Sequence, residues 1–110
     1  MSLKLGDKIP SFTLLNQDGK EVKSEAFIGS ANLVIYFYPK DDTPGCTKEA
    51  CSFRDNFEEF TDLGAQVIGI SADSPKSHTK FASKYNLPFT LLSDTKNEVR
   101  KAFGVKGSLF

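Results

Sequence analysis

The sequence has no tryptophan, one histidine, two cysteines and no net charge, since 14 acidic residues balance 14 basic ones. Nucleic-acid-binding proteins need a basic surplus, so this balance predicts no nucleic-acid partner. The longest apolar run covers residues 33–38, far short of the roughly 20 residues that span a membrane, and we expect no membrane partner either. We expect a single domain over residues 1–110.

The chain start has no apolar segment of the kind that directs secretion, because Met1-Ser2-Leu3-Lys4 leads into polar sequence. We therefore expect a cytoplasmic location, with a plastid location after removal of a transit peptide as the alternative. In such reducing compartments a close pair of cysteines is more often catalytic or metal-binding than structural.

A metal site would need about four soft ligands, whereas the chain offers only Cys46, Cys51 and His78. The C-x4-C spacing also occurs in plant-type iron–sulfur proteins, but that pattern needs another cysteine where this chain has Arg54. We therefore predict no metal site. His78 lies in the polar run 76–80, and its simplest interpretation is a solvated side chain.

Segments typical of strands and helices alternate along the chain and predict an α/β fold. Asn16-Gln17-Asp18-Gly19 marks an N-terminal β-hairpin. The segment 32–38 is apolar on both faces, which is typical of a central strand covered on both sides. The other expected elements are a helix from about Cys46 to Leu63, a strand at 67–71, a helix at 75–85, a strand at 89–92 and a helix at 97–103. This order predicts a parallel βαβαβα core.

The stretch from Pro39 to Cys51 links the apolar strand to the next helix and holds both cysteines. At 100° per residue, Cys46 lies on the same side of that helix as Ala50 and Phe53, so we expect it to face the sheet at the helix start. There, unpaired N–H groups and the helix dipole favour a thiolate over a thiol. Buried cysteine is also common as an inert residue, and that alternative stays open for both cysteines.

Cys51 follows Cys46 by five residues, which places it about 140° round the helix and ~7.5 Å along its axis. The Cα–Cα distance is then roughly 8–9 Å, whereas a disulfide needs less than about 7 Å. A disulfide between the two cysteines therefore requires the first turn or two of the helix to unwind.

Three neighbours of Cys46 are candidate site residues. Thr43 carries a hydroxyl that can bind a small oxygen-containing substrate above the sulfur, and Pro39 stiffens the loop. Glu49 lies on the Cys46 side of the helix, where a lone carboxylate disfavours a thiolate, so we expect it to position a cation. Arg54 is more simply interpreted as the partner of a surface carboxylate.

The pattern Pro39-x-x-x-Thr43-x-x-Cys46 resembles the active-site motif of peroxiredoxins. The longer string YFYPKDDTPGCTKEAC at 36–51 is similar to the peroxiredoxin Q group, also called bacterioferritin comigratory proteins, as are residues 67–71 and 87–94. The likeness extends from about Leu5 to the end of the chain. It implies a thioredoxin-like fold and a thiol peroxidase.

More specifically, the resemblance implies an atypical 2-Cys, thioredoxin-dependent peroxidase that reduces hydrogen peroxide and alkyl hydroperoxides. Cys46 is then the peroxidatic cysteine, which becomes a sulfenic acid. Cys51 is the resolving cysteine, which forms an intramolecular disulfide that thioredoxin or a similar dithiol reduces. Thr43 binds the peroxide, and Pro39 shields the sulfenic acid. The resemblance also implies a monomer without metal, haem or flavin.

The chain departs from this family in length. Family members continue with two further strands, a final helix and an activating arginine, which neither Arg54 nor Arg100 matches in position. We therefore expect a chain truncated relative to the family, with weak or no activity, and an exposed edge at strand 32–38 if nothing follows it. The alternative function is a dithiol–disulfide oxidoreductase or redox sensor without peroxide turnover, although reductases of this fold usually carry C-x-x-C.

Overall fold

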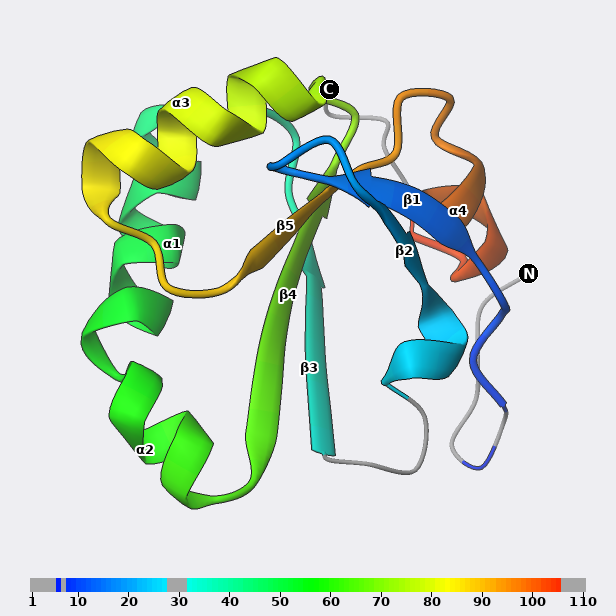
Figure 1. Ribbon diagram of the computed structural model, residues 1–110, viewed down its shortest axis with the longest axis horizontal. Helices are drawn as coiled ribbons and strands as arrows, with labels where there is room; N and C mark the ends of the chain where they lie inside the picture. Colours follow the sequence, from blue (N-terminus) through cyan, green and yellow to red (C-terminus); the bar gives the residue numbers. More distant parts are fainter. Residues whose placement is uncertain (1–5, 7, 28–31, 106–110) are drawn as a thin grey trace.

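The computed structural model describes residues 6, 8–27 and 32–105. Strands and helices alternate after an N-terminal hairpin, which confirms the predicted α/β class (Figure 1). The described elements are β1 (Thr13–Asn16), β2 (Glu21–Lys23), the 3-10 helix η1 (Ser24–Ala26), β3 (Asn32–Phe37), α1 (Pro44–Asp55), α2 (Phe57–Asp62), β4 (Ala65–Ser71), α3 (Pro75–Tyr85), β5 (Thr90–Ser93) and α4 (Glu98–Ala102).

The described strands form one sheet in the order β2-β1-β5-β4-β3. The strands β3, β4 and β5 run parallel, whereas β1 pairs antiparallel with both β2 and β5. Helices α1 and α2 connect β3 to β4, and α3 connects β4 to β5. The carboxyl ends of the three parallel strands therefore meet at one edge of the sheet, and the loops that leave them share that edge.

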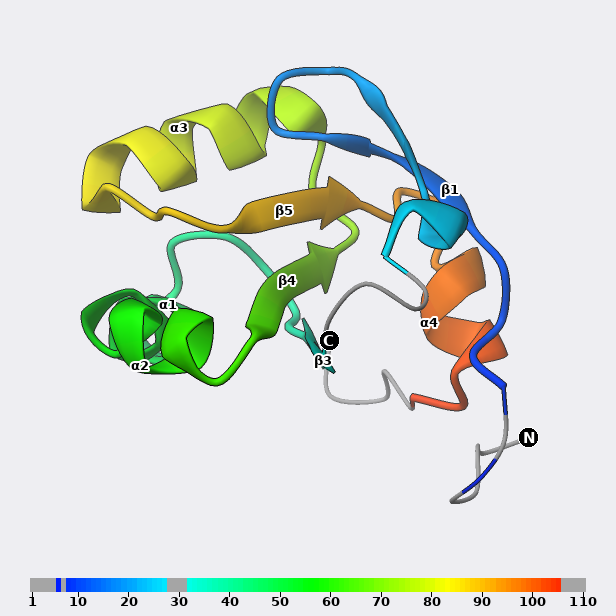
Figure 2. The same ribbon diagram turned by 60° about the horizontal axis from the view of Figure 1, so that its bottom comes forward.

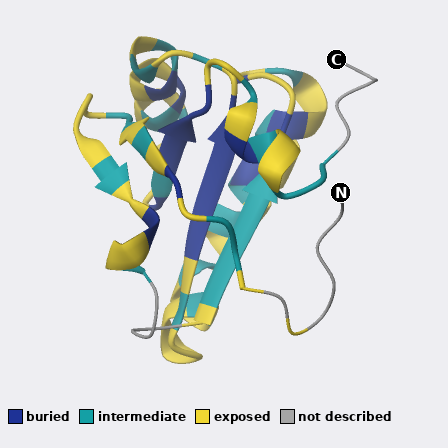
Figure 3. Cartoon of the chain, turned by 90° about the vertical axis from the view of Figure 1, so that its right-hand side faces the viewer, coloured by how far each residue is buried: buried dark blue, intermediate teal, exposed yellow. Residues whose placement is uncertain are grey.

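Apolar side chains pack on both faces of the sheet. Helices α1, α2 and α3 lie on one side and α4 on the other, with the strands between them (Figures 1 and 2). The buried residues on the first side are Tyr38, Cys46, Ala50, Val67, Phe81, Leu87, Phe89 and Leu91. Those on the second side are Phe12, Ile68, Ile70, Leu92 and Val99. The most buried strands are β4 and β5, which lie inside the sheet (Figure 3).

The position of β3 differs from the central one that its apolar pattern predicts and agrees with the edge position expected if no further strand follows. Within the described structure β3 is an edge strand that pairs with β4 alone, and residues 33–37 are half-buried. Its side chains still pack on both faces, with Val34 and Tyr36 on the α1 side and Leu33, Ile35 and Phe37 on the α4 side. A strand that is apolar on both faces thus shows that both faces are covered, and it does not show that both edges are paired.

The long helix expected from Cys46 to Leu63 is in fact two helices that meet at Asn56. The backbone of Asn56 has φ −106° and ψ 15°, and its side chain donates to the Ser52 carbonyl at 2.9 Å. A side-chain amide bound to the carbonyl four residues earlier competes with the helical hydrogen bonds, which explains the break. Gly64 follows α2 with a φ of +70°, as predicted for a glycine cap.

Helix α3 matches its prediction. Ser74 caps it by accepting a hydrogen bond from the Ser77 N–H at 3.2 Å, Pro75 lies in its first turn, and Asn86 ends it with a φ of 53°. Among the described residues, no helix combines the length and the apolar character that crossing a membrane requires.

Gly69 in β4 leaves no space for a larger residue. A Cβ at this position would lie 2.9 Å from Cζ and Oη of Tyr36 and 3.0 Å from Cδ2 of Leu91. The Tyr36 ring is held between Tyr38 and Phe53, with centroids at 5.5 and 4.7 Å. We expect Gly69→Ala to lower the free energy of unfolding by about 1–3 kcal/mol, measured by chemical denaturation.

The matched control is Gly45→Ala. Apart from its chain neighbours and the backbone of its own helix, no heavy atom of the described residues lies within 4 Å of a Cβ placed at Gly45. Gly45 lies in α1, so this variant should not lose stability. Equal losses in the two variants would contradict the steric explanation.

Candidate active site

The loop between β3 and α1 carries the candidate site residues to the carboxyl edge of the sheet. Thr43 is the N-cap of α1 and Pro44 its first residue. The Thr43 hydroxyl does not cap the helix and donates instead to the Lys40 carbonyl at 3.3 Å. The N–H groups of Gly45 and Cys46 have no acceptor in the part of the chain that the structure describes. The start of α1 thus offers two free donors at the position of Cys46.

Cys46 and Cys51 are free thiols in different surroundings. Cys46 is 8% exposed and packs into the buried cluster beneath α1 and α3, as its angular position predicts. Cys51 is only half-buried. Because residues 44–55 are helical, the geometric separation of roughly 8–9 Å applies, and it exceeds the reach of a disulfide, about 7 Å. The reduced protein therefore holds the two thiols apart.

Pro39 and Thr43 line a cavity of about 580 Å³ at this edge. Its other lining residues are Phe37, Tyr38, Lys40, Ile70, Ser71, Ala72, Asp94, Asn97 and Arg100. The guanidinium Nε and Nη1 of Arg100 are shielded from solvent and have no hydrogen-bond partner among the described residues. Cys46 is not part of the lining, so the structure brings Pro39 and Thr43 together and leaves Cys46 packed toward α3.

Glu49 is exposed and forms no ion pair with any described residue. Although the side chain reaches solvent, nearby protein atoms partly desolvate its carboxyl group and raise the pKa of that group. Arg54 Nε contacts Asp55 Oδ1 at 3.0 Å, and Arg54 Nη1 donates to the Tyr85 carbonyl at 2.8 Å. The predicted pairing of Arg54 with a surface carboxylate is confirmed, and the described residues supply no cation to Glu49.

Tyr36 in β3 and Tyr38, which follows it, stack with ring centroids 5.5 Å apart. Tyr38 donates to Asp41 Oδ1 at 2.6 Å, whereas the buried Tyr36 hydroxyl has no partner among the described residues. Burial raises the pKa of both phenols, and the neighbouring carboxylates of Glu49 and Asp41 raise the pKa of Tyr36 and Tyr38, respectively, further. The stack therefore holds one satisfied and one unsatisfied hydroxyl.

Asp42 fastens the loop to the end of α3. Its backbone has a left-handed φ of 59°, a conformation that is unfavourable for most residues other than glycine. Its carboxylate accepts from Lys84 Nζ at 2.8 Å and from the Tyr85 hydroxyl at 2.7 Å. The hydrogen bond from Lys84, and then that from Tyr85, hold the pKa of Asp42 below its ordinary value.

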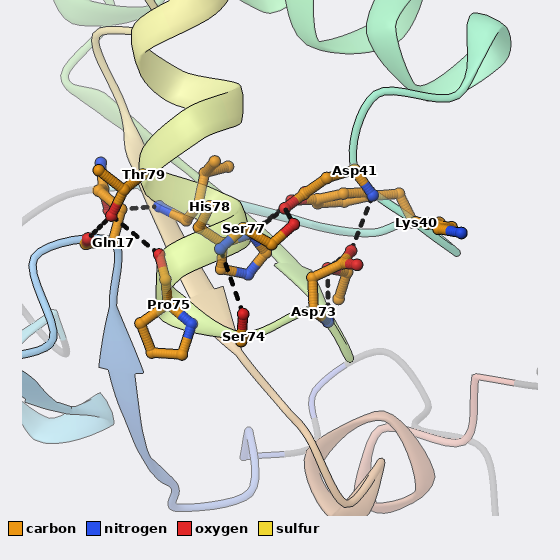
Figure 4. Close-up of polar contacts among 12 residues, drawn as sticks. Gln17, Lys40, Asp41, Asp73, Ser74, Pro75, Ser77, His78 and Thr79 are labelled. Atoms are coloured by element: carbon orange, nitrogen blue, oxygen red, sulfur yellow. Dashed lines mark hydrogen bonds and ion pairs between the residues drawn. The ribbon is translucent and has the colours of Figure 1, made fainter.

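The predicted solvated position of His78 is wrong, because its side chain is 0% exposed. Nδ1 lies 2.7 Å from Asp41 Oδ2, and Nε2 lies 3.0 Å from the Leu92 carbonyl oxygen. The Ser77 hydroxyl donates to the same Asp41 oxygen at 2.8 Å (Figure 4). His78 is buried because α3 turns it toward the sheet together with Phe81, although its sequence neighbours are polar.

The periodicity of α3 contained the signal that places His78. Phe81, Ala82 and Tyr85 follow it at helical spacings of three, four and seven residues and share its face. The sequence offered no comparable signal for Asp41, whose burial depends on a contact 37 residues away in the chain.

We expect Tyr36→Phe to raise the free energy of unfolding and Tyr38→Phe to lower it. The first change removes a buried hydroxyl without a partner, and the second removes a donor from buried Asp41. Each effect should be about 1 kcal/mol, and up to ~3 kcal/mol where Asp41 loses its donor. Chemical denaturation of both variants beside the wild type measures the difference, and equal destabilisation would contradict the assignment.

Glu49 without a cation should slow the chemistry of Cys46 in this chain, because a carboxylate one helical turn away repels a thiolate. In a Cys51→Ser background we expect Glu49→Gln to raise the rate of Cys46 alkylation by iodoacetamide about two- to fivefold at low ionic strength. The gain should shrink with added salt. Glu59→Gln, on α2, serves as the control and should change nothing. An unchanged or slower reaction of Glu49→Gln would show that Glu49 does not act on Cys46.

A model of the AhpC/TSA family matches residues 5–109. The chain is 57% identical to a chloroplastic peroxiredoxin Q of Populus jackii over 105 residues, which are 96% of this chain and 49% of that protein. It is 56% identical to the chloroplastic peroxiredoxin Q of Sedum lineare over 105 residues, covering 96% of this chain and 56% of that protein. The chain thus spans about half the length of the curated relatives it matches.

Solved structures agree in fold. Peroxidoxin BcpB of Mycobacterium tuberculosis has a TM-score of 0.88 at 40% identity, over 93% of this chain and 66% of that one. A Xanthomonas campestris bacterioferritin comigratory protein, described for its alkyl peroxide reduction activity, has a TM-score of 0.82 at 41% identity, over 87% of this chain and 60% of that one. These similarities confirm the predicted thioredoxin-like α/β fold.

Proposed function

The chain belongs to the AhpC/TSA family, and on this premise we propose that it carries the reaction centre of a thiol peroxidase. The observation that carries the proposal is the position of Cys46 in the first turn of α1, beside two N–H groups without an acceptor among the described residues. Free donors and the helix dipole at such a position stabilise a thiolate, which is the nucleophile that a peroxidase needs.

The proposed cycle begins with the Cys46 thiolate and a hydroperoxide. The sulfur attacks the terminal peroxide oxygen, the O–O bond breaks, and the leaving oxygen takes up a proton to depart as an alcohol, or as water from hydrogen peroxide. Cys46 is then a sulfenic acid. The Cys51 thiol condenses with it, which forms the disulfide and releases water. An external dithiol, thioredoxin or a similar protein, supplies the two electrons that restore both thiols.

The other site residues support this cycle in the proposal. The Thr43 hydroxyl binds the peroxide after giving up its 3.3 Å contact with the Lys40 carbonyl. Pro39 shields the sulfenic acid, and Glu49 positions a cation. The chain spans about half the length of its curated relatives, so its own peroxidase rate is a separate measurement from theirs.

Substrates, quaternary state and location belong to the same proposal. We propose hydrogen peroxide and alkyl hydroperoxides as substrates, which the activity named for the Xanthomonas campestris protein supports. We propose a single-domain monomer, because both cysteines of the cycle lie on one helix and need no second copy. The chloroplastic names of the plant relatives support the plastid alternative beside the cytoplasm.

Stoichiometric hydrogen peroxide followed by mass spectrometry tests the function. We expect the wild type to lose two hydrogens as the Cys46–Cys51 disulfide and Cys46→Ser to lose peroxide consumption. Cys51→Ser should consume one equivalent and stop at a sulfenic acid on Cys46, trapped with dimedone. A dithiol oxidoreductase would exchange disulfides without fast peroxide consumption. Consumption by Cys46→Ser at the wild-type rate would refute the proposal.

Oxidation should also open α1, because the helical spacing of the two cysteines is too long for a disulfide. We expect faster amide hydrogen exchange over residues 46–54 and a lower helix content by circular dichroism after full oxidation. Amides of α3 provide the internal control and should keep their protection. Unchanged exchange over 46–54 in the oxidised protein would contradict the spacing argument.

A further inference from the structure

We propose that His78 is a positioning residue for the Cys46 loop, which it holds through a buried hydrogen bond to Asp41 that contains a shared proton. Asp41 lies two residues before the N-cap of α1, so its position sets where the helix carrying Cys46 begins. The proposal rests on the function proposed for Cys46, although its structural part can be tested without any peroxide.

The two ring nitrogens of His78 both face oxygen acceptors. Nε2 lies 3.0 Å from the Leu92 carbonyl oxygen, which can only accept, so Nε2 carries a hydrogen. In a neutral ring Nδ1 would then present a lone pair toward Asp41 Oδ2, 2.7 Å away. Two lone pairs at that distance repel, so a proton lies between them, on Nδ1 or on the carboxyl group. The buried pair therefore retains one proton and no net charge.

Asp41 is held from several elements at once. Tyr38 donates to Oδ1 at 2.6 Å, and Ser77 of α3 donates to Oδ2 at 2.8 Å. The Asp41 backbone N–H donates to Asp73 Oδ2 at 2.7 Å, and that oxygen also accepts from the Ser71 hydroxyl at 2.7 Å (Figure 4). The titratable groups that face the pair are thus Tyr38 from the end of β3 and Asp73 from the connection between β4 and α3.

The residues around Asp41 and His78 pack in the same cluster as Cys46. Tyr38, Cys46 and Phe81 belong to one buried cluster, and Phe81 lies one turn after His78 on α3. The second attachment of the loop, between Asp42 and Lys84, is exposed at both side chains, so solvent weakens it. The contact between Asp41 and His78 is buried at both side chains, so solvent does not screen it, and we assign the positioning of the loop to it.

A metal ion is the competing occupant of this cluster. Asp41, Asp73 and His78 each offer one possible ligand atom, and these three atoms lie within 4.8 Å of one another. Their oxygens already accept hydrogen bonds from hydroxyl and N–H donors, which favours the proton. Titration of the wild type with Zn²⁺ in a calorimeter should therefore show no binding that depends on His78.

The shared proton is tested by NMR on the reduced wild type, in which His78 is the only histidine and needs no assignment. We expect a hydrogen signal at each ring nitrogen, one bound to Nε2 and one between Nδ1 and Asp41, and both should exchange slowly with solvent. A ring that takes up and loses its Nδ1 hydrogen freely, as a solvated imidazole does, would overturn the proposal. This result does not depend on peroxidase activity, so it separates a failure of this proposal from a failure of the proposed function.

Two amide variants separate the two ring contacts, because the amide of Asn falls near Nδ1 and that of Gln near Nε2. His78→Asn keeps a donor for Asp41, whereas His78→Gln keeps only the contact with the Leu92 carbonyl. We expect His78→Gln to slow peroxide reduction and Cys46 alkylation about tenfold and to speed exchange of the Asp42 amide. His78→Asn should keep both rates within about threefold of the wild type. Asp41→Asn should do the same, because its own amide can donate to Nδ1.

The control is Thr79→Val on the same helix, whose hydroxyl donates to the Gln17 and Pro75 carbonyls and does not touch the loop. It should leave loop exchange and alkylation unchanged. Equal effects of His78→Gln and Thr79→Val would overturn the proposal, as would a wild-type rate for His78→Gln or His78-dependent Zn²⁺ binding. If His78→Gln does not fold, the NMR result on the reduced wild type decides, because a freely exchanging Nδ1 hydrogen overturns the proposal.

Discussion

Three aspartates at the carboxyl ends of the parallel strands organise the edge on which the candidate site lies. Asp41 follows β3, Asp73 follows β4 and Asp94 follows β5. Asp94 accepts from the Val99 and Arg100 N–H groups at 3.2 and 2.9 Å and so starts α4, while Asp73 accepts the Asp41 N–H. Asp73 and Asp94 satisfy backbone donors where the parallel strands end, whereas the Asp41 carboxylate accepts from the side chains of Tyr38 and Ser77.

The site combines two requirements that oppose each other. A helical first turn presents free N–H groups at Cys46, while the same helix keeps Cys46 and Cys51 too far apart for a disulfide. In the proposed cycle, order in α1 therefore favours the reaction with peroxide, and loss of that order is needed for the disulfide to form. The break at Asn56 divides the long connection into α1 and α2, and both cysteines lie in α1.

Much of the fold followed from sequence, because its signals are local. The Asp-Gly turn, the serine and proline at the start of α3 and the glycine after α2 each determine the backbone of a few residues. The break at Asn56, the edge position of β3 and the burial of His78 do not follow from the local composition of each segment. The first depends on a side-chain contact with Ser52, the second on strand order, and the third on which side of α3 meets the sheet. The helical periodicity that includes Ala50 predicts the burial of Cys46 correctly, whereas the polar neighbours of His78 predict a solvated position that the packing of α3 overrides.

The Cys46 segment is attached to α3 near both of its ends, and this limits where it can open. Before α1, Asp41 and Asp42 bind His78 and Lys84. Near the end of α1, Arg54 binds the Tyr85 carbonyl at 2.8 Å. In the proposed cycle, unwinding is then confined to the residues between these anchors, which include both cysteines. A segment that is held at both ends gains less conformational entropy when it unwinds than a free segment does. Its ends also stay in place, so α1 can refold after reduction. The buried contact between Asp41 and His78 therefore helps α1 to refold after reduction as much as it positions Cys46 before the reaction.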